Sequence, residues 1–389
     1  MQCRFFAAGF RPMFLAAGVG ALLLLPAWIA VLVYGAPLPS GWPPTLWHAH
    51  EMLYGFVAAA IAGFLLTAVP SWTGQRGFAG WPLLVLLGLW VLARLLDALA
   101  AAWPAMLVAT VDAAFLCVLG ALVAPPLVRE RNRNTPLLAV LATLVGCNLA
   151  FHWNLARHDP EAARRALYLG IDLVLLLVTV IGGRIVPAFT ANALRAANSP
   201  VRPCAWRGVG GAAIAAMVAL ALVDLLAPGG RLAAVLALLA ALVQALRLAQ
   251  WRGPRTLGQP ILWVLHLGYA WLPLGLALKA LASTGGPAWS AFWLHALTIG
   301  VLATMILGVM TRAALGHTGR PLRVAAPVTA AYLLLLLAAL VRVFGLAVPG
   351  VAYPKVLLLS AIPWTAAFAQ FVGVYAPILW GPRADGRPA

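Results

Sequence analysis

The chain has 389 residues, of which 64% are hydrophobic and only 9% are charged, and its mean hydropathy is +0.97. This composition excludes a soluble globular protein and predicts a polytopic membrane protein. The net charge of +17 would suggest a nucleic-acid partner for a soluble protein. Here alternate loops carry the basic residues, as membrane topology alone requires, so we expect no nucleic-acid binding.

Apolar stretches recur along the whole chain, separated by basic residues and by turns rich in glycine and proline. A hydrocarbon core of about 30 Å needs roughly 20 apolar residues per helix, so the chain predicts about twelve transmembrane helices. The predicted helices lie near 12–34, 48–70, 81–102, 105–127, 135–155, 166–188, 209–227, 232–251, 261–283, 289–310, 325–347 and 353–379. Because the loops are short, we expect an all-α transmembrane bundle in which residues 1–389 form a single integral membrane domain.

The basic residues predict the orientation of the helices. The loops on one side carry most of the arginines, whereas the other side holds only Arg157, Arg164, Arg165, Arg231 and Lys355. By the positive-inside rule, the arginine-rich side is cytoplasmic and both termini lie there.

Residues 47–52, Trp-His-Ala-His-Glu-Met, place three ionisable side chains at the start of the second predicted helix. Such residues are costly within a membrane and commonly serve a function. Residues two positions apart on a helix are rotated by about 200° relative to each other. His48 and His50 should therefore point to opposite sides unless the helix begins after His48. Glu51 shares the face of His48, where it could orient that ring or relay protons. Tyr54 lies on the side of His50, and Glu51 and Tyr54 are the candidate catalytic residues.

Other ionisable residues gather toward the predicted periplasmic ends of the helices. His152 and His295 fall at the same level as the histidines of the second helix. Several imidazoles at one depth are the simplest way to hold haem iron or copper between helices, although a lone histidine more often forms an interhelical hydrogen bond. The acids at this level could instead form structural ion pairs with nearby cations. These acids and cations are Glu51, Asp97, Asp112, Asp172, Asp224, Arg94, Lys279 and Arg342.

A weak internal repeat relates the second and tenth predicted helices, which run in the same direction. It predicts two similar, closely packed helices that each offer one imidazole at the same depth. Chance identity between two helices rich in alanine and glycine is the alternative. The repeat aligns His50 with His295, Gly55 with Gly300, Ala58 with Ala303, Ile61 with Ile306 and Gly63 with Gly308.

Two further histidines lie away from this level and are kept as candidate cofactor-binding residues. His266 falls near the cytoplasmic end of the ninth helix, where it either binds a second cofactor or makes a packing contact. His317 belongs to a segment, 316–321, whose glycines and proline predict a turn in a cytoplasmic loop.

Several of these motifs together resemble the NnrS family, and the resemblance runs from the amino terminus to the final helices. The motifs are Phe10-Arg11-Pro12, residues 47–52 with Gly55, residues 62–70, Trp72-Thr73-Gly74, Gly183-Arg184 with residues 187–190, residues 265–269, residues 295–298 and residues 316–321. The resemblance implies a bacterial inner-membrane protein that contains haem and copper. It also implies a role in nitric oxide metabolism and in resistance to nitrosative stress.

The resemblance and the depth of the histidines lead to one main hypothesis. The protein would reduce nitric oxide to nitrous oxide at a haem–copper centre near the periplasmic side, with Glu51 as the proton source. Because the chain has no Cys-x-x-Cys-His attachment site, any haem should be non-covalent haem b. Electrons would come from quinol or another membrane donor. The expected metal ligands are first His50 and His295, then His48 and His152, and the expected partners of haem propionates are Arg94 and Arg342.

Two other functions fit the sequence. One is a non-catalytic protein that binds nitric oxide, haem or copper and thereby protects against nitrosative stress. The other is a secondary transporter, because twelve helices with a repeat are a common transporter plan. Membrane lipid is the expected surrounding partner in every case, and the sequence does not specify an oligomeric state.

Overall fold

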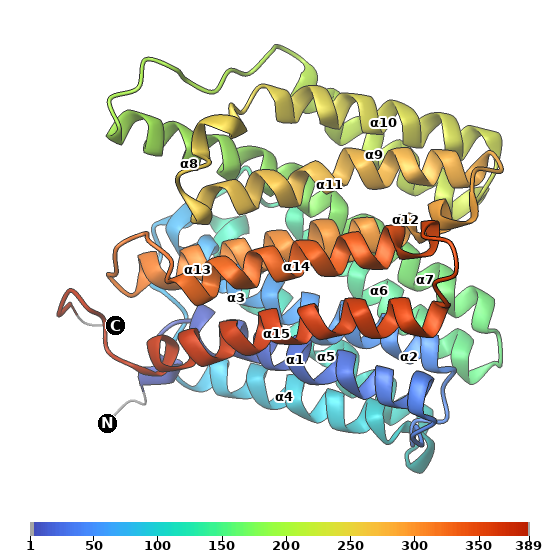
Figure 1. Cartoon of the computed structure of the whole chain (residues 1–389). Coiled ribbons are helices and arrows are strands. Elements are labelled where there is room, and N and C mark those ends of the chain that lie inside the picture. Colours follow the sequence, from blue (N-terminus) through green and yellow to red (C-terminus); the bar gives the residue numbers. More distant parts are fainter. Residues whose placement is uncertain (1–3, 388–389) are drawn as a thin grey trace. The chain divides into compact units, whose positions relative to one another are not determined.

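The computed structural model describes residues 4–387, which form helices joined by loops and, within that range, no strand (Figure 1). Twelve of the described helices are long and apolar enough to cross a membrane, which confirms the predicted all-α, multi-pass fold. They are Phe10–Tyr34, Pro44–Thr73, Trp81–Ala98, Ala105–Arg129, Leu137–Ala156, Pro160–Ala196, Val209–Leu226, Arg231–Ala249, Pro260–Ser283, Ala288–His317, Ala326–Ala347 and Tyr353–Trp380.

Several predicted helix ends differ from the structure, most of all those of the sixth helix, predicted at 166–188 and found at Pro160–Ala196, and two of the differences concern candidate residues. Helix α2 (Pro44–His50) begins before His48, with proline at its first position, where a missing N–H removes no helical bond. Residues 47–52 are therefore helical, and the extended alternative is excluded. Helix α13 (Thr304–His317) includes His317, which the sequence places in a loop. The left-handed backbone that follows such a helix occurs at Gly319, with φ +70°, two residues after His317, so the helix continues through Gly316.

The helices divide into two compact units. Unit 1 comprises 4–170, 312–321 and 368–387; unit 2 comprises 171–311 and 322–367. Unit 1 contains α1 (Phe10–Tyr34), α2, α3 (Ala58–Thr73), α4 (Trp81–Ala98), α5 (Ala105–Arg129) and α6 (Leu137–Ala156). Unit 2 contains α8 (Gly183–Ala196), α9 (Val209–Leu226), α10 (Arg231–Ala249), α11 (Pro260–Ser283), α12 (Trp293–His295) and α14 (Ala326–Phe344). Helices α7 (Pro160–Leu177), α13 and α15 (Tyr353–Trp380) supply residues to both units.

The two ends of the described chain meet within unit 1. Phe5 stacks on Trp380 with ring centroids 4.2 Å apart. The buried guanidinium of Arg11 donates hydrogen bonds to the carbonyls of Leu379 (2.8 Å) and Gly381 (2.7 Å). The last carbonyls of a helix have no helical donor, so Arg11 caps the end of α15. Both terminal segments therefore lie at one end of unit 1, whereas the side of the membrane stays a prediction.

Three spans of the described chain contain a π-helical segment: Glu51–Val57, Val178–Gly182 and Ala296–Ala303. The first directly follows His50, and the third directly follows His295. Short π-helical segments occur frequently at functional sites. The two histidines that the sequence aligns thus precede the same departure from α geometry, while the repeat itself stays a prediction.

Close helix contacts at two of the aligned glycines make a testable prediction. A Cβ added at Gly63 would lie 2.5 Å from the Phe14 ring, and one added at Gly300 would lie 2.5 Å from the Trp271 ring. Alanine at either position should therefore lower the free energy of unfolding by about 1–3 kcal/mol. The measurement is thermal unfolding of the purified protein in detergent.

Gly146 provides the matched control, because a Cβ there meets no atom within 4 Å. It lies inside α6, where alanine is favoured over glycine by about 1 kcal/mol. Gly146→Ala should therefore leave stability unchanged or raise it. Equal effects at positions 63 and 146 would refute the close packing of α3 on α1.

Candidate functional site

A group of ionisable and polar side chains is buried at one end of unit 1. Residues 99–104 connect the end of α4 to the start of α5, and α6 packs along α5, so residues near these helix ends reach one level. We call this group the His50 cluster. It consists of His50 from α2, Glu51 from the π-helical segment, Arg94 and Asp97 from α4, Asp112 from α5, and Asn148 and His152 from α6.

Asp112 is the shared acceptor of the cluster. Its Oδ2 atom lies 3.1 Å from Nε2 of His50 and 3.2 Å from Nε2 of His152. The same oxygen accepts a hydrogen bond of 2.7 Å from Nδ2 of Asn148. Asp112 is only 2% exposed, so a buried carboxylate holds two imidazoles that come from different helices.

Arg94 contacts all three carboxylates of the cluster. Its Nη1 donates to Oε1 of Glu51 at 2.7 Å, and its Nη2 lies 3.0 Å from Oδ2 of Asp97 and also pairs with Asp112. If both histidines are neutral, the three carboxylates and the one guanidinium give the cluster a net charge of −2. Such a charge is expensive away from water, so bound cations or protons are needed to offset it.

The other side of His50 carries polar atoms without hydrogen bonds. Its Nδ1 atom lies 3.6 Å from Oε1 of Glu51 and 3.9 Å from Oδ2 of Asp97, which is too far for a hydrogen bond. Within residues 4–387, Oε2 of Glu51 and Oδ1 of Asp97 also have no hydrogen-bond partner, whereas Oδ2 of Asp97 is paired with Arg94. Each such buried group costs about 1–3 kcal/mol, so this side fits an ion, a proton or water.

Two sets of side chains in the cluster have metal-ligand spacing: His50 with Asp112 and His152, and His50 with Glu51 and Asp97. Ligand bonds of about 2.1 Å in a tetrahedral site place the ligand atoms roughly 3.4 Å apart, close to the distances in both sets. Imidazole suits zinc, copper, iron and nickel, whereas carboxylate suits magnesium, calcium or manganese. The set with two histidines therefore fits a transition metal, copper among them, better than magnesium.

A haem does not fit inside the cluster. Phe151 stacks on the His50 ring with centroids 4.5 Å apart, and Trp42 meets that ring edge-on at 5.5 Å. His50 is fully buried, and its two ring nitrogens face the cluster's carboxylates. The cluster thus has side chains at a spacing that could hold an ion, but it leaves no space for a macrocycle.

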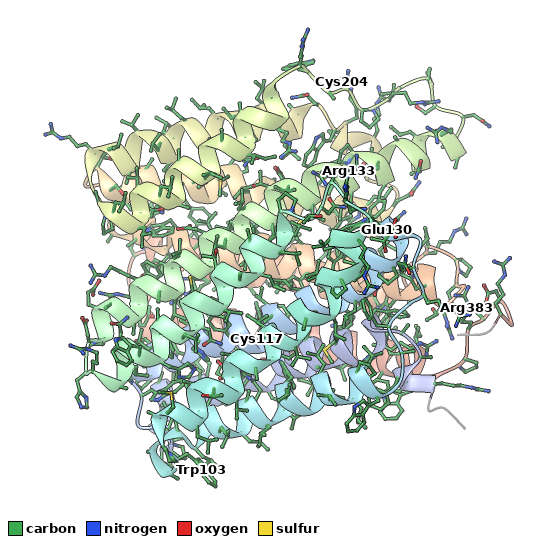
Figure 2. All side chains as sticks on the ribbon, turned by 180° about the vertical axis from the view of Figure 1, so that it is seen from behind. Trp103, Cys117, Glu130, Arg133, Cys204 and Arg383 are labelled. Carbon is green, nitrogen blue, oxygen red and sulfur yellow. The ribbon has the colours of Figure 1, made fainter. Side chains whose placement is uncertain are left out.

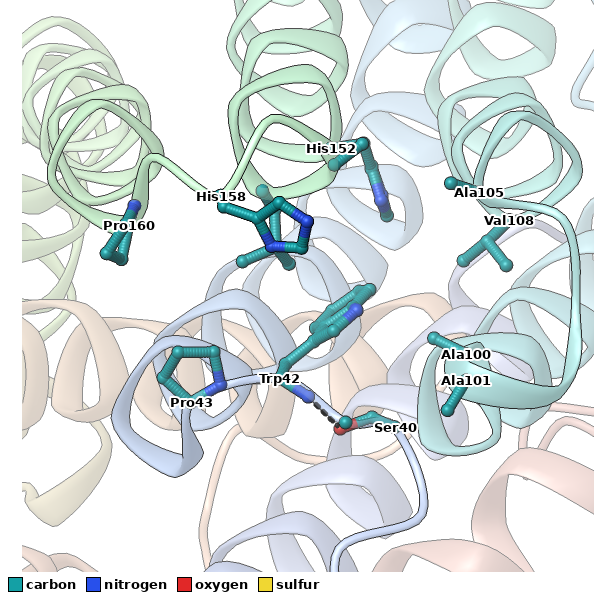
Figure 3. Close-up of a pocket in the computed structure, with 13 residues that line it drawn as sticks. Ser40, Trp42, Pro43, Ala100, Ala101, Ala105, Val108, His152, His158 and Pro160 are labelled. Atoms are coloured by element: carbon teal, nitrogen blue, oxygen red, sulfur yellow. Dashed lines mark hydrogen bonds between the residues drawn. The ribbon is translucent and has the colours of Figure 1, made fainter.

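A pocket of about 530 Å³ reaches one side of the cluster (Figure 3). His152 forms part of its wall together with Trp42, His158 and Val108. Figure 3 shows the Trp42 side chain extending toward His152 and His158. Because His152 also contacts Asp112, it connects the pocket to the buried cluster. A small uncharged molecule could reach the cluster by this route.

The structure confirms that His48 and His50 point to different sides. The His48 ring stacks on Trp28 of α1 at 4.1 Å, whereas His50 contacts α5 and α6. Oε1 of Glu51 accepts a hydrogen bond from Arg94 and lies 3.6 Å from Nδ1 of His50, so Glu51 joins the His50 cluster, and its predicted role toward the His48 ring stays a prediction. Tyr54 does lie beside His50, with ring centroids 4.9 Å apart, and its hydroxyl donates to the carbonyl of Leu144.

His295 and Arg342 belong to unit 2. The His295 ring lies 6.0 Å from that of Phe292, over which the Arg342 guanidinium sits at 4.7 Å. Arg342 donates to the Tyr353 hydroxyl and has no carboxylate partner among the described residues. The predicted meeting of His295 with His50, and the predicted roles of both arginines toward haem propionates, stay predictions. Arg94, unlike Arg342, already forms ion pairs with three carboxylates of this protein.

The remaining candidates lie in other surroundings. Nε2 of His266 in unit 2 is 2.9 Å from the Thr190 hydroxyl, and no described residue forms a hydrogen bond with its Nδ1. His317 in unit 1 packs beside Phe10 at the start of α1, the opposite end from α2. Lys279 and Asp224 form an ion pair, as expected for a structural pair.

The sequence predicts neither Asn148 nor Trp42 as a site residue, and it marks Asp112 only as one of several acids. Asn148 could have been found, because it is four residues before His152 and therefore on the same helix face. Trp42 lies in the loop before α2, and no periodic pattern marks it.

The model of the NnrS protein family matches residues 4–383, a range that includes every residue of the His50 cluster. No curated protein gives a significant match to the chain.

Proposed function

Because the chain belongs to the NnrS family, we propose that it is a bacterial inner-membrane protein that reduces nitric oxide at a copper ion held by the His50 cluster. Membership itself suggests a role in the response to nitric oxide, within a family associated with haem and metal binding. The observation that carries the copper site is the pair of imidazoles, from α2 and α6, on one buried carboxylate.

The residues divide into two roles around the His50 ring. On its Nε2 side, His50, His152 and Asp112 would hold the ion, and the ion would offset the cluster's negative charge. On its Nδ1 side, Glu51 and Asp97 offer oxygens without hydrogen-bond partners. Glu51 would hold a proton at Oε2 and deliver it into the cluster, while Arg94 fixes its other oxygen.

Copper would supply a redox-active ion to which nitric oxide can bind. The overall reaction joins two nitric oxide molecules with two electrons and two protons to give nitrous oxide and water. A membrane quinol is the proposed source of the electrons. The pocket beside His152 would admit nitric oxide, which is small and uncharged and therefore needs no hydrophilic channel. Haem b remains a proposed second cofactor, bound outside the His50 cluster.

Purified protein tests this proposal in three measurements: copper content, optical spectrum and anaerobic consumption of nitric oxide with added reductant. We expect stoichiometric copper, a Soret band and formation of nitrous oxide. Copper without nitric oxide consumption would instead indicate a non-catalytic binding protein. Absence of both copper and a Soret band from protein grown with both cofactors would reject the proposal and favour a transporter.

A further inference from the structure

A second pocket of unit 1, of about 230 Å³, lies at the other end of α5 from the His50 cluster. Arg76 and Arg129 supply its charge, and Pro70, Phe78, Pro125 and Pro126 are among its apolar lining residues. Figure 2 shows Glu130 and Arg133, which follow this end of α5, well separated from Trp103, which precedes its start. The pocket is therefore distinct from the proposed metal site.

Within the described chain, the two arginines of this pocket form no ion pair, although the carboxylate of Glu130 borders the pocket through Gln75. Among residues 4–387, no carboxylate forms an ion pair with either guanidinium. The nearest acid in the sequence, Glu130, accepts a hydrogen bond of 3.1 Å from Gln75 instead. Arg76 and Arg129 are both exposed, so an anion can approach them.

The pocket lies where apolar helices end or begin, which is the level at which a membrane is expected to change from hydrocarbon to water. Helix α3 ends at Thr73 and α5 ends at Arg129, next to the two arginines. Trp81, 72% exposed, begins the adjacent helix α4, and exposed tryptophan is typical of the membrane interface. An occupant here would therefore meet cations at its polar end and proline and phenylalanine at its apolar end.

The loop after α5 is held in place by hydrogen bonds. Nδ2 of Asn132 donates to the carbonyl of Trp72 at 2.9 Å, which ties the loop to the end of α3. The Thr135 hydroxyl lies 3.1 Å from the carbonyl of Leu127, to which it donates. The ends of α3 and α5 are thus joined before any ligand arrives, which lowers the entropy cost of binding.

We propose that this pocket binds the phosphodiester headgroup of an anionic phospholipid. Guanidinium groups bind phosphate oxygens with paired, charge-assisted hydrogen bonds, and basic pockets near helix ends are typical lipid headgroup sites. The apolar wall of proline and phenylalanine would contact the glycerol and the first acyl carbons. The proposal does not depend on the reaction at the His50 cluster.

Native mass spectrometry of the detergent-purified protein with added phosphatidylglycerol or phosphatidylcholine tests this site. The double variant R76Q/R129Q should bind phosphatidylglycerol about 30-fold more weakly, as expected for the loss of two interfacial arginine contacts. The matched control R195Q/R207Q removes two exposed arginines outside the pocket and should bind like the unmodified protein. R76K/R129K should bind with intermediate affinity, because it keeps both charges but loses the paired contacts of the guanidinium groups.

Three results would overturn the proposal. The first is unchanged phosphatidylglycerol binding by R76Q/R129Q when its thermal unfolding matches that of the unmodified protein. The second is equal binding of phosphatidylcholine and phosphatidylglycerol. The third is that inorganic phosphate occupies the same arginines and excludes phosphatidylglycerol at equal concentration, which would identify a site for a free anion.

Discussion

Asp112→Asn is expected to abolish copper binding at the His50 cluster while leaving the fold intact. The substitution keeps the size of the side chain but removes the charge that both imidazoles share. Loss of a ligand should weaken copper binding by more than about 100-fold, since loss of an outer hydrogen-bond partner alone costs 10–100-fold. The measurement is copper content after dialysis, supported by titration of the metal-free protein.

Two further variants make this result specific. His266→Gln alters a buried histidine of unit 2 and should leave copper bound to the His50 cluster. Asp97→Asn removes a carboxylate from the Nδ1 side of His50 and should also retain copper. If Asp97→Asn lost copper and Asp112→Asn kept it, the ion would lie on the opposite side of the His50 ring from the proposed site.

Arg94→Met is expected to produce the largest loss of stability. The substitution leaves Glu51, Asp97 and Asp112 buried without their shared cation. Removal of one partner from a buried ion pair costs about 3–5 kcal/mol. Unfolding by heat or denaturant in detergent, with metal-free protein at neutral pH, measures the change.

The charge explanation for Arg94 predicts a partial rescue. In the double variant R94M/D97N, one carboxylate has been removed, so the loss of stability should be smaller than in R94M. Arg94→Lys should lie between R94M and the unmodified protein, because one ammonium cannot reproduce the paired contacts of a guanidinium. If R94M changed the free energy of unfolding by less than about 0.5 kcal/mol, the carboxylates would not be charged in the absence of metal.

The sequence predicts the depth in the membrane at which the site residues lie, but not which of them contact one another. The histidines and acids of the second to fifth helices could be assigned to one end from their distance to the helix ends. The opposite directions of His48 and His50 followed from helical rotation alone. The π-helical segment that begins at Glu51 could not be anticipated, because hydropathy is the same for α and π geometry, and neither could the contact of Glu51 with Arg94 of another helix.

The amino-acid sequence by itself determined that this protein crosses the membrane as twelve helices. A chain in hydrocarbon must satisfy its backbone hydrogen bonds within each segment, so apolar length is sufficient to mark every span. Only the tertiary structure decided that Asp112 of α5 joins His50 of α2 to His152 of α6, and that Arg94 serves three acids. Helix neighbours are selected by packing between side chains distant in sequence, and no periodic pattern within one span records which helix lies beside it.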